Sequence, residues 1–445
     1  MNTKKPFSFI IVSFILICII WSILIPPFEA PDESGHYGYV SFILNNSSLP
    51  KPPYSWNEGG SLYQPPLYYL MLSPILKTFG KLNYDNGLRP NPKWVENRFQ
   101  VANAFIGSFK ESIFSKNSNI RVVYLLRFVS ILLATVTVFF TFKLASLIFL
   151  KHKNLVIFST LLVAFNPQFI FHSSAITNDN LAILLTTLAI FLMVKTIKGV
   201  KINPKTALAL GLVVGLAIIT KLNLLFLVVV IFIFLLMLYR EKYLQILKTG
   251  FFILAGILIS GGWYFYLNLS RYGEPFGISA QTEMFAVFAN RNTGYHLLND
   301  VLLFFMASFQ TYWGMFGWYN IYMPQAYYLL ILSVILFSMW GLWNYFKENI
   351  KTIFKTTLDK QLLILLLSIF ILWGSMLLTF LKYPVVSNGR FLFPTIAPFA
   401  ILMVFGVKKY LLKFNLENKH INLLAIGGFL INILILFIII LPKYQ

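Results

Sequence analysis

Long apolar runs recur from one end of the chain to the other, with short polar stretches between them. About 17 to 25 mostly apolar residues are enough for a helix to cross the hydrocarbon core of a bilayer. The pattern therefore predicts an all-α polytopic membrane protein, a bundle of about eleven transmembrane helices. The helices are expected at 7–26, 120–143, 155–172, 179–195, 206–220, 222–239, 249–268, 326–346, 361–381, 391–410 and 420–441.

Composition agrees with a membrane protein and excludes a soluble globular one. Hydrophobic residues make up 58% of the chain and charged residues 11%, whereas soluble domains carry about 25% charged residues. The formal net charge of +21 does not indicate a nucleic-acid partner, because the basic residues lie between the predicted helices and not on one basic stripe. We expect the lipid bilayer as the environment and no nucleic acid.

Lysine and arginine are concentrated in every second connection between the predicted helices. If the amino terminus is cytoplasmic, the cytoplasmic segments carry 20 Lys and Arg residues, and the opposite side carries 7 apart from its first long loop. Basic residues that flank membrane helices are mostly kept in the cytoplasm. This asymmetry predicts a multi-pass protein of the cell membrane with its amino terminus cytoplasmic and its carboxy terminus outside.

Two outward segments are too long to be simple connections, so we expect them to carry function. The first is 27–119 and the second is 269–325, within a single transmembrane domain that takes in 1–445. Each contains an amphipathic piece too short to span a membrane, at 67–80 and at 301–316. We predict that these pieces are amphipathic helices lying on the outer surface.

The strongest chemical signal is the segment PPFEAPDESGHYGY at 26–39, directly after the first predicted helix. Asp32 and Glu33 are adjacent carboxylates, and His36 follows Asp32 by four residues, so one helical turn would place Asp32 and His36 on the same face. A carboxylate beside the membrane can be tuned as a general base, and its oxygens suit a hard divalent cation. The alternative is a helix cap in a solvated loop.

Three short outward turns are also polar, HSSAITNDN at 172–180, TKLN at 220–223 and KYPVVSNGR at 382–390. Charged groups this close to hydrocarbon usually face a cavity, a partner or a substrate path. All three turns are expected on the same side as the acidic segment. Their charged residues include Asp179, Lys221 and Arg390.

The PDExxH pattern at 31–36 resembles the acidic motif in the first outer loop of GT-C membrane glycosyltransferases, which include protein O-mannosyltransferases and the lipid A aminoarabinose transferase. Further elements of that superfamily follow in the expected order. They are QPPLYY at 64–69, NPQ at 166–168 with NDN at 178–180, TK at 220–221, WY at 263–264 with YGEP at 272–275, WGMFGW at 313–318 and GRFLFP at 389–394. The last two resemble a bacterial branch of the superfamily. The chain departs from the pattern before Asn268, where the usual arginine is missing.

The resemblance implies a GT-C-like fold and inverting transfer of a sugar from a polyprenyl-phosphate donor to a cell-envelope glycan, lipid or protein at the outer face. Asp32 would then be the catalytic base, supported by Glu33 and His36. Fixed positive charge is needed to stabilise the departing phosphate. The residues expected at the donor phosphate are Lys221, Arg271 and Arg390, and those expected at the substrate are Gln64, Tyr68, Tyr69, Asn178 and Asp179. The residue types fit both metal-free catalysis and a divalent cation held by Asp32 and Asp179.

Several of these residues also have ordinary structural explanations. Lys221 and Arg390 flank helices, where long basic side chains reach toward the interface. Arg271 could be solvated in its loop, and Asp179 could cap a helix. An aromatic cluster favours an interfacial belt first and a sugar-stacking surface second; its members are Trp313, Phe316, Trp318 and Tyr319.

Two other functions stay open beside the glycosyltransferase. A transporter or flippase for a lipid-linked sugar would be expected to have related halves and ionisable groups at mid-membrane; here the predicted helices are nearly free of acids at their centres, and no convincing pair of related halves is seen. A noncatalytic scaffold for envelope assembly is the third hypothesis.

Overall fold

Helices make up most of the chain. The computed structural model describes residues 4–52, 54, 61–77, 89–97, 102–106, 118–150, 152–197, 202–286, 297–351, 355–383, 388–411 and 418–444. Parts of both predicted outward segments lie outside these described residues. Within them, strands form only two short antiparallel pairs, so the predicted all-α class is confirmed.

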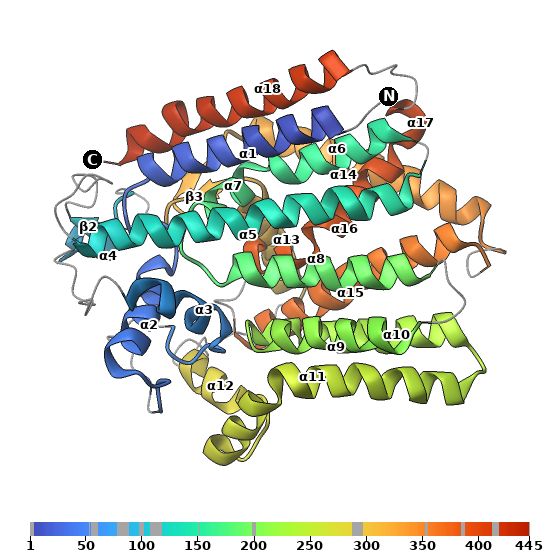
Figure 1. Cartoon of the computed structure of the whole chain (residues 1–445). Helices are drawn as coiled ribbons and strands as arrows, with labels where there is room; N and C mark the ends of the chain where they lie inside the picture. The colour runs from blue at the N-terminus through green and yellow to red at the C-terminus, as the bar shows by residue number, and fades with distance from the viewer. Residues whose placement is uncertain are drawn as a thin grey trace.

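The long helices lie side by side in one bundle (Figure 1). In chain order they are α1 (Lys4–Leu24), α5 (Ser118–Ile148), α8 (Asp179–Thr196), α9 (Pro204–Ile218), α10 (Phe226–Tyr239), α11 (Tyr243–Tyr272), α14 (Gln325–Glu348), α15 (Thr357–Lys382), α16 (Ile396–Gly406) and α18 (Asn418–Leu434). The start of α1 and the end of α18 lie at opposite ends of the bundle (Figure 1). The two ends of the chain were predicted on opposite sides of the membrane, and which of them is cytoplasmic stays a prediction.

The described residues contain fewer full spans than the expected eleven. In the described part of the chain, nine helices are long and apolar enough to cross a membrane. A tenth span would consist of α6 (Lys153–Ala164) and α7 (Pro167–Ser173), which are bent by 58°. The remaining run is α9, which has 15 residues and falls short of a full span.

The bend between α6 and α7 has a local cause. The side chain of Asn166 accepts a hydrogen bond from the backbone amide of Phe169, and Pro167 occupies the first position of α7. Proline at this position lacks the amide that would continue α6, while asparagine is a favoured cap. A new helix therefore begins inside what looks like one apolar run.

Short elements gather at the end of the bundle where α18 finishes, on the left in Figure 1. They include α2 (Glu33–Asn46), α3 (Leu67–Leu76), α4 (Pro92–Asn97), α12 (Ile278–Ala286), and the pair β1 (Arg89–Pro90) and β2 (Phe105–Ile106). The chain continues with α13 (Leu297–Trp313) and the pair β3 (Met315–Phe316) and β4 (Ile321–Tyr322). Further turns of helix are η4 (Leu222–Leu225), η6 (Gly389–Thr395), α17 (Lys408–Leu411), η7 (Ile435–Ile440) and η8 (Leu441–Lys443). The two amphipathic pieces, now α3 and α13, are helices as predicted.

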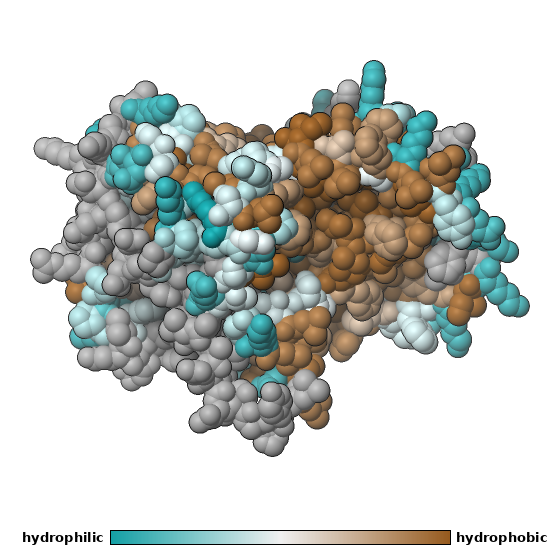
Figure 2. Space-filling view, turned by 90° about the horizontal axis from the view of Figure 1, so that it is seen from below, coloured by the Kyte–Doolittle hydropathy of each residue, from teal (hydrophilic) through white to brown (hydrophobic). Residues whose placement is uncertain are grey.

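The side of the bundle is apolar where lipid would surround it. Figure 2 shows a broad hydrophobic area over its middle, bordered at the right by hydrophilic residues. Helix α11 contributes exposed Phe251, Leu258 and Trp263 to the apolar surface. Exposed apolar side chains in such number agree with a bilayer as solvent.

Helices α9 and α11 approach each other so closely that only glycine fits between them. A Cβ atom on Gly211 would overlap the carbonyl of Ile253, and one on Gly256 would overlap the carbonyl of Leu208. Small residues permit this kind of contact between membrane helices. The packing fixes α9, and with it the turn at its end that carries Lys221.

Replacing Gly211 by Ala is expected to destabilise the protein by about 1–3 kcal/mol, because overpacking forces the two backbones apart. Gly374→Ala on α15 is the matched control, since a Cβ there meets no atom within 4 Å. Unfolding can be followed with a thiol-reactive dye, because Cys18 is the single cysteine of the chain and is buried. Equal stability of the two variants would contradict the close packing.

Candidate active site

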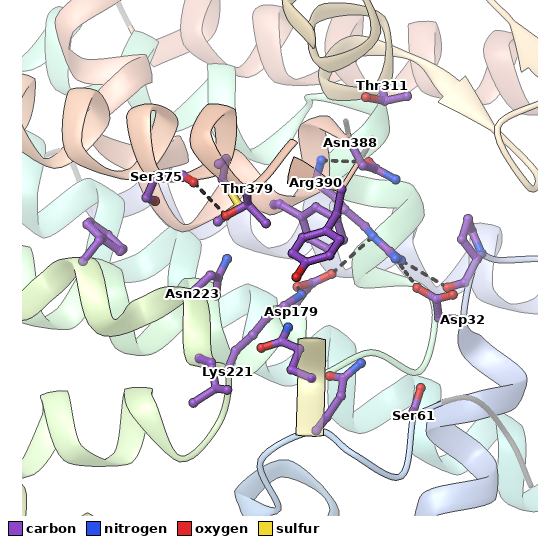
Figure 3. Close-up of a pocket in the computed structure, with 18 of the residues that line it drawn as sticks. Asp32, Ser61, Asp179, Lys221, Asn223, Thr311, Ser375, Thr379, Asn388 and Arg390 are labelled. Carbon is purple, nitrogen blue, oxygen red and sulfur yellow. Dashed lines mark hydrogen bonds and ion pairs between the residues drawn. The ribbon is translucent and has the colours of Figure 1, made fainter. Parts of the chain in front are cut away.

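Side chains from distant parts of the sequence meet around a cavity of about 1280 Å³. Its polar wall includes Asp32 before α2, Asp179 in the first turn of α8, Lys221 between α9 and η4, and Arg390 in η6 (Figure 3). His36 and Gln64 also line it. These six residues were singled out from the sequence as separate motifs, and the fold brings them to one pocket.

The four charged side chains form an alternating chain of cations and anions (Figure 3). Lys221 pairs with Asp179, and Arg390 pairs with Asp32. The link between the two pairs is longer, with Arg390 Nε 3.8 Å from Asp179 Oδ2. The cluster is therefore balanced in charge, and each carboxylate already has a cation beside it.

Asp32 sits at a strained position that turns its side chain into the pocket. It precedes α2 with φ 62° and ψ 1°, in the left-handed region, and its side chain makes no capping hydrogen bond. A left-handed residue other than glycine costs energy, and such residues cluster at functional sites. The side chain is 44% exposed, although it pairs with Arg390. Asp32 thus occupies the N-cap position of α2, but its side chain does not cap the helix.

Charge outweighs burial in setting the pKa of Asp32, whereas burial outweighs the neighbouring carboxylates in setting the pKa of His36. Burial alone would raise the pKa of Asp32, but Arg390 and the other cations outweigh it and hold the pKa below its ordinary value. Burial lowers the pKa of His36 to about 4. At neutral pH the pocket therefore holds an ionised Asp32 and a neutral His36.

The protonated nitrogen of His36 follows from its hydrogen-bond partners. The Tyr69 hydroxyl donates to Gln64 Oε1 at 3.4 Å, and the same oxygen accepts from Asn178 Nδ2 at 2.5 Å. The Tyr69 hydroxyl must then accept from His36 Nδ1, at 2.8 Å. A neutral imidazole protonated at Nδ1 leaves Nε2 as a proton acceptor.

Lys221 has a lowered pKa because burial disfavours its charged form, and the neighbouring Asp179 only partly compensates. Its ammonium lies 4.6 Å from the ring centre of Phe391, and the guanidinium of Arg390 lies 5.0 Å from the same ring. Phe391 thus stands between the two cations and contributes a cation–π contact to each.

Glu33 has a different place from the one expected beside Asp32. It is missing from the described lining of the pocket and forms a fully buried ion pair with Arg127 of α5, both side chains being 0% exposed. Its two oxygens also accept the backbone amides of Phe28, at 2.9 Å, and Ile176, at 3.0 Å. Its contribution is to hold the acidic loop, and direct contact with a substrate is excluded by these partners.

Arg127 is the residue that the sequence did not reveal as important. Its guanidinium donates to Glu33 through Nε and Nη2, at 2.7 and 2.6 Å. The remaining donors go to the carbonyls of Ser22, Ile25 and Pro26, at 2.7, 2.7 and 3.0 Å. All five N–H groups of the side chain are used. A lone arginine within an otherwise apolar run was the available signal.

Four other predicted site residues lie behind the pocket or away from it. Arg271 donates to the carbonyl of Pro50 at 3.0 Å and is not part of the described lining, so its expected place at the donor phosphate is corrected. Tyr68 is buried against Ser130. Tyr69 and Asn178 are buried as well, and they support His36 and Gln64 from behind.

The carboxylates of the pocket do not form a complete set of metal ligands. Among the residues that the structure describes, no group of three or more His, Cys, Asp or Glu side chains is placed to hold a metal ion. Asp32 and Asp179 are both paired with cations. A divalent cation held by Asp32 and Asp179 stays a prediction.

Replacing Arg127 by Met, or Glu33 by Gln, is expected to lower the free energy of unfolding by about 3–5 kcal/mol, because each change leaves its partner buried and unpaired. Arg121→Met is the control, since Arg121 is exposed on the same helix. Denaturant titration with Cys18 labelling measures the change. Losses no larger than in the control would contradict the assigned role.

His36 should make stability depend on pH in a defined window. The unfolded side chain takes up a proton near pH 6.5, whereas the folded one stays neutral down to about pH 4. The unfolded state therefore binds more protons between these values, and stability falls as the pH falls, by up to about 1.4 kcal/mol per unit. His36→Asn keeps a donor for Tyr69 and should flatten this dependence. Parallel pH curves for the two proteins would refute it.

The comparisons with known proteins agree with this architecture. Residues 104–264 match the family model for dolichyl-phosphate-mannose-protein mannosyltransferase. The search of curated proteins finds no match. ArnT from Cupriavidus metallidurans in the apo state is similar in structure, with a TM-score of 0.53 and 11% identity over 96% of this chain and 63% of that one.

A second similar structure is the Archaeoglobus fulgidus oligosaccharyltransferase, with a TM-score of 0.53 and 13% identity over 99% of this chain and 55% of that one. The chain thus spans about three fifths of the length of these solved proteins. At such identity the likeness concerns the fold. The chain has the fold of these two membrane proteins, and the match of residues 104–264 to the mannosyltransferase family model agrees with the resemblance found in its sequence.

Proposed function

We propose that the protein is an inverting glycosyltransferase that moves a sugar from a polyprenyl-phosphate donor to a cell-envelope acceptor at the outer face of the membrane. The observation that carries the proposal is the meeting of Asp32, Lys221 and Arg390 in one pocket. A base and two cations are what displacement of a lipid phosphate requires.

The shape of the pocket supports a lipid-linked donor. One part of its wall is apolar and comes from η4, α10 and α15; its residues include Leu222, Phe226, Val229, Ile371 and Leu378. Val229 and Leu378 are 48% and 70% exposed on the side of the bundle. A prenyl chain could therefore leave the pocket toward the bilayer, while its phosphate stays beside Lys221 and Arg390.

Asn223 offers a further polar contact where the apolar and charged parts meet. Its amide lines the pocket, and neither amide atom has a hydrogen-bond partner among the described residues. An unsatisfied buried amide is costly. A phosphate oxygen of the donor would satisfy its N–H group.

The reaction follows from the charges around Asp32. In the free protein Arg390 neutralises Asp32 and keeps it a weak base. A donor phosphate would compete for Arg390 and Lys221, and the carboxylate released from Arg390 would become more basic. Asp32 then takes the proton of the acceptor hydroxyl. The acceptor oxygen bonds to the anomeric carbon as the bond from that carbon to the phosphate oxygen breaks, and the lipid phosphate leaves with the electron pair.

The other residues have supporting roles in this proposal. His36, neutral with Nε2 unprotonated, adds no positive charge that would weaken the base. Gln64 lines the pocket and is held by Tyr69 and Asn178. Glu33 fixes the loop, and Arg271 is left out of the donor site because of its place beside Pro50.

Asp32→Asn is expected to abolish transfer while the protein still folds and inserts, because the amide cannot accept the proton. Mass spectrometry of envelope glycans, lipids and proteins from cells with the wild-type protein, without it, and with each variant measures the transfer. Asp300→Asn is the control, because Asp300 lies in the first turn of α13 and outside the described pocket lining.

We expect one added sugar with the wild-type and control proteins, and its loss in the null and Asp32→Asn cells. Full restoration of the sugar by Asp32→Asn would remove Asp32 as the base. Passage of a labelled lipid-linked sugar across proteoliposomes without any glycosidic product would favour the flippase hypothesis instead.

A further inference from the structure

Three aromatic side chains of one hairpin line the same pocket. The strands β3 and β4 pair antiparallel; Trp318 and Tyr319 of the turn between them and Tyr322 of β4 line the pocket wall. Trp313 and Phe316 point elsewhere, since they are 8% and 0% exposed within the core. The segment is therefore not a simple interfacial belt, and its second half faces the site.

Tyr319 is held in a strained conformation that directs its ring toward the charged cluster. Its φ is 62°, in the left-handed region that bulky residues rarely adopt. The guanidinium of Arg390 lies 5.9 Å from the centre of its ring. Strain of this kind persists where the surroundings enforce it and is concentrated at ligand sites. The ring thus stands next to the cation assigned to the donor phosphate.

The hairpin is braced from several directions. The side chain of Gln168 on α7 accepts from the Met315 amide at 2.8 Å and donates to the Met315 carbonyl at 2.9 Å. The indole of Trp318 donates to the carbonyl of Phe28 at 3.2 Å. Because the amide of Phe28 is bound by Glu33, the aromatic rings and the acidic loop are fixed relative to each other. A rigid surface loses little entropy when it binds a ligand.

Beside the charged cluster, the pocket wall near the hairpin also carries uncharged polar groups. Gln310 and Thr311 of α13 and Asn388 before η6 line the same pocket. Asn388 and Thr311 also shape η6, by accepting the amides of Arg390 and Gly389 at 3.1 and 2.6 Å. Amides and hydroxyls can exchange hydrogen bonds with sugar hydroxyls, while aromatic faces cover the apolar C–H face of a sugar ring.

We propose that the β3–β4 hairpin is the platform on which the donor's glycosyl group stacks, and that it selects an uncharged sugar. The proposal rests on the proposed function, because the phosphate beside Arg390 places the attached sugar next to Tyr319. An ammonium group on the sugar would pair with Asp32 and block the base. Both carboxylates of the described lining belong to the catalytic cluster, and neither is spare for such a group.

The test measures binding of three synthetic lipids to the purified full-length protein. They are farnesyl phosphate, mannosyl farnesyl phosphate and glucosaminyl farnesyl phosphate. The variants are Trp318→Ala, Trp318→Phe and, as control, Trp343→Ala on α14, whose ring is 69% exposed on the side of the bundle. Both changes at Trp318 remove the hydrogen bond to Phe28, so their difference isolates the aromatic ring.

We expect the mannosyl lipid to bind the wild-type protein roughly tenfold more tightly than farnesyl phosphate. Trp318→Ala should remove this difference in affinity between the two lipids, Trp318→Phe should keep most of it, and Trp343→Ala should keep all of it. Farnesyl phosphate itself should bind all four proteins equally. The glucosaminyl lipid should gain less than the mannosyl lipid.

Retention of the mannosyl gain in Trp318→Ala would overturn the platform, and so would an equal or larger gain for the glucosaminyl lipid. These outcomes leave the phosphate site intact. The proposed function itself fails if farnesyl phosphate does not bind, or if Lys221→Met and Arg390→Met do not weaken its binding. The two failures are therefore distinguishable.

Discussion

The buried ion pair between Arg127 and Glu33 is the interaction on which the site depends. Its guanidinium satisfies three carbonyls at and beyond the end of α1, which have no partner within the helix. Its carboxylate partner binds the loop before α2 and, through Ile176, the connection between α7 and α8. One pair of side chains thus joins the segment between α1 and α2, helix α5 and the connection between α7 and α8, which lie far apart in the sequence. A buried pair is retained only when its hydrogen bonds are complete, as they are for this guanidinium.

Asp32 and Glu33 are adjacent in the sequence but have different roles. Glu33 points into the protein and fixes the loop, while Asp32, in its left-handed conformation, points into the pocket. The cations that face Asp32 come from other elements, Lys221 from the turn after α9 and Arg390 from η6. In the proposed reaction Arg390 pairs with the carboxylate of Asp32 in the free protein and with the donor phosphate once the donor is bound. Donor binding would therefore raise the basicity of Asp32, because both groups compete for Arg390.

The sequence predicted the charged residues that meet in the pocket, but it did not predict the side-chain direction of every candidate residue. The lengths of the apolar runs predicted the helices. The acidic segment and the polar turns contain the four charged residues that line the pocket, Asp32, Asp179, Lys221 and Arg390. Glu33 was misplaced because adjacent residues in a left-handed turn diverge, and sequence adjacency does not reveal that turn. Long-range contacts explain the other differences. Arg271 donates to the carbonyl of Pro50, more than two hundred residues away in the sequence. The role of Arg127 depends on the acidic loop that folds against it, and the sequence does not show that contact. The sequence signal for the break between α6 and α7 was the capping Asn166 followed by Pro167. The break was missed because the apolar residues on both sides form one run long enough for a single helix.

The most direct test of the central claim is an experimental structure of the protein with a polyprenyl monophosphate bound. We expect the phosphate between Lys221 and Arg390, the prenyl chain along α10 and α15, and Asp32 separated from Arg390 and facing the open side of the pocket. The Arg127–Glu33 pair should be unchanged. A phosphate bound away from these two cations, or an Asp32 still paired with Arg390 beside the bound lipid, would contradict the mechanism.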